Sequence, residues 1–355
     1  TTLRFSTFVG GAQGAEENPR GAVEIDEARN RIYVAGTTAA TDFPTTPGAF
    51  QTGFGGGSGD AFVFALSMDG RNLVAATYLG GIGSEMASTE IEPHPAGDSF
   101  YVAGGTNSPN FPVTADAYQR TLADGNPADP FWASGDAFLG RISADLSTVQ
   151  YATFYGGSSA DAVSHNQGVA VDSRGRAVLI GHTESTDLPL PAGANVFDSS
   201  LGGSSDGFVA IFTPQGALAH ATYLGGSDSE EVAGAFTGPQ DRVYLTGGTR
   251  SDDFPVTAGA YQTAFGNTAS GGNMSDAFLT VFDSSLETAE YSTFLGGSGT
   301  MAWSERGRSI WVTSTGRAVV GGVTDSADFP LVSPSVQPQI GGDLDAFFIG
   351  FDPQP

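Results

Sequence analysis

A five-residue stretch, typified by Thr-Tyr-Leu-Gly-Gly, recurs along the chain and constrains its fold more than any other feature. Its five copies begin at Thr7, Thr77, Thr153, Thr222 and Thr293, at intervals of 69 to 76 residues. A nearly fixed period of this length is the mark of a repeat protein, in which each unit buries its apolar face against its neighbours. The sequence therefore predicts five similar units in series.

Each repeat is predicted to supply four short strands. The third repeat shows the first two most plainly, because residues 168–172 (GVAVD) and 176–183 (RAVLIGHT) flank a Ser-Arg-Gly turn. Turn residues of this kind between two β-rich runs favour a hairpin. A third strand begins with Asp-Ala-Phe or Asp-Gly-Phe, and the fourth carries the Thr-Tyr-Leu-Gly-Gly stretch. No segment shows helical periodicity.

A long loop with its own motif, Thr-x-x-x-Asp-Phe-Pro, separates the second and third strands of each repeat. The Asp position is occupied by Asp42, Asn110, Asp187, Asp253 and Asp328. Regularly placed Phe and Pro residues indicate loops that pack on themselves.

The two ends of the chain carry halves of one strand pair. Residues 1–9 have no preceding partner, and residues 345–351 have no following one. If these segments paired, the array would close and leave no open sheet edge. The sequence thus predicts an all-β fold: a five-bladed β-propeller with four antiparallel strands per blade, closed by the N-terminal strand, as one domain over residues 1–355. An open solenoid is the alternative, but no polar caps are visible.

The combination of Thr-Tyr-Leu-Gly-Gly, Gly-Val-Ala-Val-Asp at 168–172, the Asp-Phe-Pro loop motif and Asp-Ala-Phe-Val at 60–63 resembles the bacterial SBBP repeat family. The resemblance covers nearly the whole chain. It implies a β-propeller and an extracellular or cell-surface location. The family name implies seven blades, whereas this sequence gives five. No catalytic residue carries over from the family.

The charge of the chain is one-sided. Asp and Glu number 39 against 14 basic residues, all of them Arg, for a net charge of -25. Nucleic-acid binding needs clustered cations, so nucleic acid is excluded as a partner, and anionic membranes are disfavoured. Cations, neutral sugars and basic proteins stay open.

The absence of cysteine and of long apolar runs excludes further classes of site and location. There is no Cys, so disulfides, thiolate metal sites and cysteine nucleophiles are excluded. No apolar run is long enough for a membrane helix, which argues against direct membrane insertion. The chain starts inside a strand-like segment, so an upstream piece is expected to have been removed, as in a secreted bacterial protein.

The loops that follow each Gly-Gly are where the repeats diverge, and the predicted propeller brings them toward its axis. Carboxylates meeting there would suit Ca²⁺, and Trp303 beside Glu305 and Arg306 would suit a sugar. The alternative is solvated loop charge. The candidate binding residues are Glu17, Arg20, Glu85, Glu90, Asp161, His165, Asn166, Glu230, Glu231, Trp303, Glu305 and Arg306.

The repeated aspartates before the third strand are Asp60, Asp136, Asp206, Asp276 and Asp345. An Asp before a strand commonly accepts hydrogen bonds from nearby backbone N–H groups, so a structural role is predicted for them rather than metal binding. The Asp of the Asp-Phe-Pro motif has the same interpretation.

The function predicted from the sequence is non-enzymatic: a secreted or surface-displayed protein that binds a protein or glycan, or forms part of an extracellular assembly. The alternative is a carbohydrate-active hydrolase or lyase with two close carboxylates at the axis. The longest loop, residues 107–135, contains Phe131 and Trp132 as candidates for a protein contact, with extra self-packing as the other interpretation.

Overall fold

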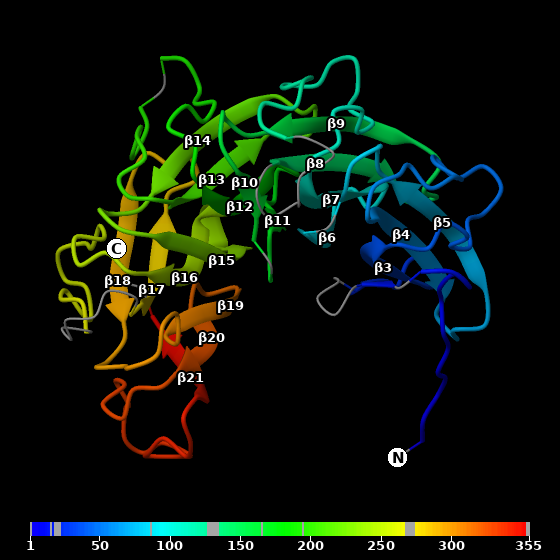
Figure 1. The fold of residues 1–355 in the computed structure, drawn as a ribbon. Helices are drawn as coiled ribbons and strands as arrows, with labels where there is room; N and C mark the ends of the chain where they lie inside the picture. The colour runs from blue at the N-terminus through cyan, green and yellow to red at the C-terminus, as the bar shows by residue number, and fades with distance from the viewer. Residues whose placement is uncertain are drawn as a thin grey trace. The chain divides into compact units, whose positions relative to one another are not determined.

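The computed structural model of the chain describes residues 2–14, 16–17, 23–85, 87–125, 135–164, 166–193, 195–266 and 274–352. Within these ranges the protein is all-β, with five antiparallel sheets and a short 3₁₀ helix at Pro239–Asp241 (Figure 1). None of the helical structure in the described ranges has the length and apolar character needed to cross a bilayer.

The chain divides into two compact units. The first comprises Thr1–Leu179, Ser185–Pro189 and Phe212–Leu218. The second comprises Ile180–Glu184, Leu190–Ile211 and Ala219–Pro355. The first two sheets belong to the first unit, the last two belong to the second, and the third sheet has strands in both. A single domain over the whole chain stays a prediction.

The first two sheets show how one repeat folds. The first has the order β1-β3-β4-β5, with β2 also paired to β3, and the second has the order β6-β7-β8-β9. Their strands are β1 Glu16–Glu17, β2 Val23–Asp26, β3 Arg31–Thr38, β4 Asp60–Ser67, β5 Leu73–Leu79, β6 Ala87–Pro93, β7 Ser99–Thr106, β8 Asp136–Ser143 and β9 Val149–Tyr155.

The third and fourth sheets repeat this plan. Their orders are β10-β12-β13-β14, with β11 also paired to β12, and β15-β16-β17-β18. The strands are β10 Asp161–Val163, β11 Val169–Val171, β12 Ala177–Thr183, β13 Asp206–Phe212, β14 Leu218–Leu224, β15 Glu230–Thr237, β16 Val243–Thr249, β17 Asp276–Phe282 and β18 Ala289–Leu295.

The extra strand in two of the sheets is a division of the first strand of the repeat. In the fourth sheet β15 pairs along its length with β16 and shifts register between Val232 and Gly234. In the first and third sheets the corresponding stretch is divided into β1 with β2 and β10 with β11, and both pieces pair with the same neighbour. The strand order within a repeat is therefore the one that the sequence predicts.

Among the described residues the fifth sheet has three strands, β19 Arg306–Val312, β20 Ala318–Thr324 and β21 Asp345–Phe351. Strand β21 pairs with β20 alone, and residues 2–9, which the sequence assigned to close the array, are not in a strand. No sheet is closed on itself. The predicted closed five-bladed propeller, with residues 1–9 paired to 345–351, is therefore wrong for this structure. Similar strand motifs showed which segments can pair, but not that these two do.

The Asp-Phe-Pro loops pack on the sheets through their aromatic residue. Ring centroids of Phe43 and Phe62 lie 4.7 Å apart, and those of Phe111 and Phe138 lie 4.4 Å apart. The same contact recurs at 4.7 Å between Phe254 and Phe278, and at 4.6 Å between Phe329 and Phe347. Such offset aromatic pairs stabilise beyond their buried area. Each of these four loops is thereby held against the third strand of its own repeat.

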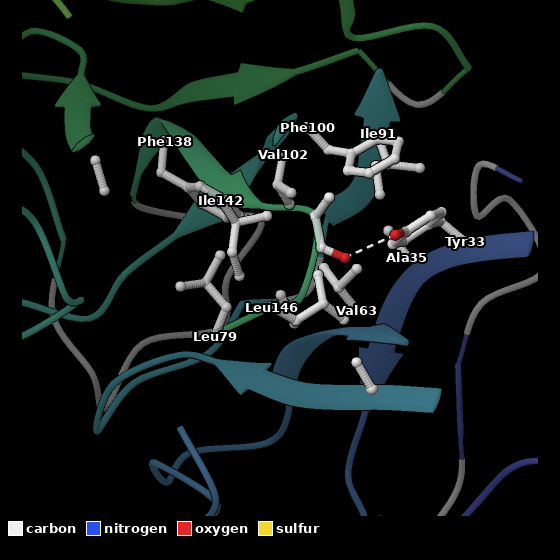
Figure 2. Packing of buried hydrophobic residues seen from close by; sticks show 14 of the residues in the cluster. Tyr33, Ala35, Val63, Leu79, Ile91, Phe100, Val102, Phe138, Ile142 and Leu146 are labelled. Carbon is white, nitrogen blue, oxygen red and sulfur yellow. Dashed lines mark hydrogen bonds between the residues drawn. The ribbon is translucent and has the colours of Figure 1, made fainter. Parts of the chain in front are cut away.

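The core of the first unit lies between its first two sheets. Figure 2 shows Val63 and Leu79 from the first sheet against Phe138, Ile142 and Leu146 of the second repeat. All five side chains are at most 1% exposed. Burial of this size is the main stabilising contribution in such a layered fold, at about 25 cal/mol per Å² of apolar surface.

Candidate active site

Four of the acidic residues predicted to bind a ligand instead hold the Gly-Gly turns in place. They accept a hydrogen bond from the N–H of the second glycine of a Gly-Gly turn, at 3.0, 2.6, 2.8 and 2.9 Å. All are buried. The four donor–acceptor pairs are Gly81 with Glu85, Gly157 with Asp161, Gly226 with Glu230 and Gly297 with Glu305.

In the three glutamates of this set, the other carboxylate oxygen bonds to the end of the second strand. Thr106 donates to Glu85 Oε1 at 2.6 Å, Thr249 donates to Glu230 Oε1 at 2.7 Å, and Thr324 donates to Glu305. The loops that seemed to diverge thus contain a repeated acid whose identity and spacing vary. Its hydrogen bonds fix the turn, so these residues do not form an open binding site.

The aspartates before the third strand also bond to backbone groups, which confirms their predicted structural role. Asp60 accepts from Gly55 N–H at 2.6 Å, and Asp276 accepts from Gly266 N–H at 2.7 Å. Burial raises the pKa of Asp60 to about 6 and that of Asp276 to about 8. Each lies against the first glycine of the turn, opposite the repeated acid.

For a different group of carboxylates, no such partners are found in the described part of the chain. Glu90 and Glu92 lie two residues apart on β6, so their side chains share one face of the strand. Glu24 on β2 is the register counterpart of Glu92, since each lies opposite a tyrosine of the next strand. We call Glu24, Glu90 and Glu92 the carboxylate cluster; all three belong to the first unit.

In the carboxylate cluster, the pKa values of Glu90 and Glu92 are raised as far as that of the structural Asp276, but no hydrogen bond from a described residue opposes the shift at either glutamate. Burial, followed by the charge of Glu92, raises the pKa of Glu90 to about 8. Burial, followed by the charge of Glu24, raises the pKa of Glu92 to about 8, and burial raises that of Glu24 as well. No ion pair among the described residues involves any of the three.

Glu90 carries the clearest sign of function in this cluster. It is 6% exposed, and its Oε1 is buried with no hydrogen-bond partner in the described part of the chain. Leaving a buried polar atom unpaired costs roughly 1–3 kcal/mol, more for a charged group. The acid also has no repeated equivalent, since Gly168, Gly234 and Ser309 hold the corresponding places. The fold therefore bears a cost at this position, where the strand itself does not require an acid.

A second polar group, which we call the Trp303 cluster, lies in the second unit. Arg306 Nη1 lies 3.1 Å from Glu231 Oε2. The guanidinium of Arg250 lies over the ring of Trp303, 5.7 Å from its centroid. Burial lowers the pKa of His182, although the charges of Glu231 and Glu184 oppose that shift. All of these side chains except the exposed Glu184 are partly accessible.

Sequence reasoning thus named some members of both clusters and missed others. It named Glu90, Glu231, Trp303 and Arg306, and the last three do come together. It missed Glu24, Glu92, His182 and Arg250, because they lie on strands or just after one, whereas the argument considered only loops. Glutamate alternates with apolar residues in Val-Glu-Ile of β2 and Glu-Ile-Glu of β6, and this alternation could have indicated that the glutamates share one face of each strand.

The remaining candidates are less informative. The backbone N–H of Asn166 donates to Ser164 Oγ at 3.4 Å, and its Nδ2 is buried without a partner among the described residues. Glu17 is in β1, but its side chain is not described. Arg20, His165, Phe131 and Trp132 lie outside the described residues.

No group of three or more His, Cys, Asp or Glu side chains in the described ranges is arranged to hold a metal ion. Calcium binding elsewhere on the chain stays a prediction.

Comparison with known proteins adds little to this geometry. No protein-family model matches the chain, and no curated protein matches it. A protein of unknown function from Dyadobacter fermentans DSM 18053 is 11% identical, with a TM-score of 0.40 over 90% of this chain and 81% of the other. The polysaccharide lyase Uly1 is also 11% identical, with a TM-score of 0.40 over 96% and 75%. These likenesses are too distant to support a fold or an activity here, and the resemblance to SBBP repeats stays a prediction.

Proposed function

We propose that this protein is a carbohydrate-active hydrolase whose working groups are Glu24, Glu90 and Glu92. The observation that supports the proposal is the burial of Glu90 beside Glu92, with no ion pair to either carboxyl among the residues that the structure describes. Acids whose pKa is near 8 keep a proton at neutral pH, which is what a general acid requires.

The hydrolysis needs two carboxyl groups in opposite protonation states. The protonated member donates its proton to the glycosidic oxygen as the bond from that oxygen to the anomeric carbon breaks. The ionised member takes a proton from a water molecule, and the oxygen of that water bonds to the anomeric carbon. Like charges so close together oppose one another's ionisation, so the three carboxyls titrate as a coupled group in which one loses its proton before the others.

The spacing of the strand suits this chemistry. Two residues of an antiparallel strand advance about 6.8 Å, and glycosidases use carboxyl separations of about 5–9.5 Å. Glu24, from a neighbouring strand, adds a third group that keeps the charge of Glu92 unfavourable. The acidic surface of the chain agrees with a neutral polysaccharide as the substrate.

The proposal is tested by measuring the release of reducing ends from a panel of neutral polysaccharides. We expect the wild-type protein to cleave at least one, and Glu90→Gln and Glu92→Gln to lower kcat by at least about 100-fold, as loss of a general acid or base does. Glu287→Gln, at an exposed position, is the matched control and keeps full activity. Undiminished cleavage by both cluster variants would refute the assignment.

A second candidate function, glycan binding without catalysis, is favoured by the Trp303 cluster. An accessible aromatic ring beside an Arg–carboxylate pair offers a stacking face and planar hydrogen-bonding groups for sugar hydroxyls. Trp303 also has φ of 54°, a left-handed conformation that is uncommon for non-glycine residues.

A glycan array distinguishes the two functions. If the Trp303 cluster is a lectin site, the wild-type protein binds a glycan and Trp303→Ala abolishes that binding, while Glu90→Gln leaves it intact. Retained binding in Trp303→Ala would exclude this site as the lectin site.

A further inference from the structure

Within the described ranges, the fifth sheet lacks a strand on the outer edge of β21. The groups that contact such a strand in the other sheets are nevertheless present there; we call them the receiving site. In the other four sheets a fourth strand covers the third. Strands β4, β8, β13 and β17 are consequently buried almost throughout, whereas β21 alternates between buried and exposed positions. Phe348 is 80% exposed, although its counterparts Val63, Leu139, Val209 and Leu279 are all 0% exposed.

The polar groups of the receiving site are a glutamine and the aspartate that begins β21. Gln337 Nε2 donates to Asp345 at 2.9 Å, and Gly341 N–H donates to the same carboxylate at 2.6 Å. The corresponding glutamines Gln51, Gln119 and Gln262 use their free Oε1 to accept the N–H of the first glycine of a Gly-Gly turn, at 3.0, 3.1 and 3.1 Å. No described donor reaches Gln337 Oε1.

An apolar hollow continues this receiving site. It has a volume of about 800 Å³ and is lined by Phe329, Pro330, Val336, Phe347 and Ile349, among others. In the complete sheets the aromatic residue of the fourth strand pairs with the counterpart of Phe347, as Tyr78 does with Phe62 and Phe294 does with Phe278. The hollow is thus the place for one strand and its aromatic ring.

The N-terminal segment has the sequence pattern of the fourth strand that the fifth sheet lacks. Residues 2–11 end in Thr7-Phe8-Val9-Gly10-Gly11, the same pattern as the fourth strands, but residues 2–9 are unpaired. The side chain of Phe8 is fully exposed. By the register of the complete sheets, Phe8 would lie opposite Phe347 and Thr7 opposite Phe348, while Gly10 would donate to Gln337.

Apolar side chains near the N-terminal segment and near β21 are also exposed. Val23 on β2 is 58% exposed, whereas its counterparts Ile91, Val169, Ala235 and Ile310 are at most 3% exposed. In the fifth repeat, Val336 is fully exposed, whereas the residues in its place in the third and fourth repeats, Phe197 and Tyr261, pack on Phe282 and Phe351 of the following sheet. Apolar positions that are covered in the inner repeats are thus exposed in the first and in the fifth repeat.

We infer that β21 accepts residues 2–9 of a second copy of this chain, so that the first repeat of one molecule docks on the fifth repeat of another. Residues 2–9 are in no strand and β21 pairs with β20 alone, so both this segment and the receiving site are available to a second molecule. The contact is head-to-tail, because it joins two different surfaces; it closes as a dimer if it is reciprocal, and otherwise extends. Strand addition to an open edge provides main-chain hydrogen bonds, and the hollow provides selectivity.

Cysteine cross-linking tests this inference directly, because the natural chain has no Cys. Thr7→Cys and Phe348→Cys are made in separate full-length chains, mixed and oxidised. We expect a mixed covalent dimer that neither variant forms alone. A chain carrying both substitutions that cross-links only within itself would overturn the inference, and so would the absence of any cross-link.

A glycine substitution supplies the matched control. At the equivalent glycines Gly80, Gly156, Gly225 and Gly296, an added Cβ would lie 2.3–2.7 Å from an atom of the aspartate carboxylate before the third strand. Gly10→Ala should therefore block insertion beside Asp345 and abolish the mixed cross-link, whereas the neighbouring exposed substitution Gln13→Ala should preserve it.

A peptide experiment keeps the inference falsifiable if Phe348→Cys fails to fold. A synthetic peptide of residues 2–11 is added to the full-length Gly10→Ala chain, and binding is followed by fluorescence anisotropy. Saturable binding, lost when Phe8 of the peptide is replaced by Asp, supports the acceptor site. Equal binding of the two peptides, or none, contradicts it.

Discussion

At the residue scale, Glu90 is a buried acid that the other repeats lack, and this difference indicates a functional role. A buried carboxyl with no partner favours its protonated form, since burial penalises the charge. Its natural equivalents in other repeats are small and neutral, so the strand itself does not require an acid there. We regard the resulting cost in stability as the physical sign of a functional group.

The pH dependence of stability follows from the direction of these shifts. Glu90 and Glu92 have folded-state pKa values of about 8, above the unfolded value near 4.5, so the folded protein binds more protons between those limits. The free energy of unfolding should therefore fall as pH rises from 5 to 8. One pKa unit corresponds to about 1.4 kcal/mol, so the buried Glu90 alone contributes on the order of a few kcal/mol.

Chemical denaturation at pH 5 and pH 8 measures this effect. The double variant Glu90→Gln/Glu92→Gln should show a markedly smaller difference between the two pH values than the wild type. A wild-type protein as stable at pH 8 as at pH 5 would contradict the assigned electrostatics.

A second prediction at this scale concerns Tyr78. Its hydroxyl donates to Ala40 O at 2.7 Å and accepts from Phe43 N–H at 2.8 Å, all in a buried site. Tyr78→Phe leaves both backbone groups without this partner and should lower the free energy of unfolding by about 1–3 kcal/mol. Urea denaturation gives the value. The reverse change at the equivalent position, Phe294→Tyr, is not expected to stabilise the protein, because overpacking a buried site costs energy.

At the element scale, the Gly-Gly turn is the best-defined unit of the fold. The first glycine passes between two carboxylates, and a Cβ at Gly80 would lie 2.4 Å from Glu85 Oε2 and 2.5 Å from Asp60 Cγ. The Asp or Asn of the Asp-Phe-Pro loop then accepts the next N–H beyond the turn, as Asn110 does from Ile82 at 2.8 Å. This close approach explains why glycine stands at this position in every repeat.

Gly80→Ala should lower the free energy of unfolding by about 1–3 kcal/mol or more, as overpacking does. The control is Gly53→Ala, where an added Cβ meets nothing within 4 Å and φ is not positive, so little change is expected. Thermal denaturation of both variants measures the difference. Equal melting temperatures would mean that the turn relaxes at little cost.

This scale also shows what sequence could and could not predict. Strand identity and order within a repeat followed from periodicity and turn residues, which are local properties. The shared role of Glu85, Asp161, Glu230 and Glu305 was missed, because the acid lies four residues after the second glycine in three copies and eight in the last. The carboxylate cluster was missed in part, because it joins two strands from different repeats, and only the structure brings them together.

At the scale of the whole molecule, the two ends of the array differ from its interior. Closure was predicted from matching end sequences, but matching segments need not pair within one chain. In the structure the last sheet lacks its fourth strand, and its third strand is consequently exposed on alternate residues. Stability should therefore be distributed unevenly along the chain.

Hydrogen exchange detects this unevenness. Amides of β21, in particular Ala346, Phe348 and Gly350, should exchange well before those of β17, which a fourth strand covers on its outer edge. Mass spectrometry of peptic fragments from a dilute sample measures both. Equal protection of the two strands at every concentration would show that the edge of β21 is always covered.

The most direct test of the proposed carboxylate site is a titration of Glu90 and Glu92 in the intact protein, followed by the ¹³C shifts of their carboxyl carbons. We predict that the pair titrates with at least one apparent pKa near 8, and that replacing Glu24 with Gln lowers the pKa of Glu92. If both carboxyls instead titrate near 4.5, like solvated glutamates, neither holds a proton at neutral pH and the proposed general acid does not exist.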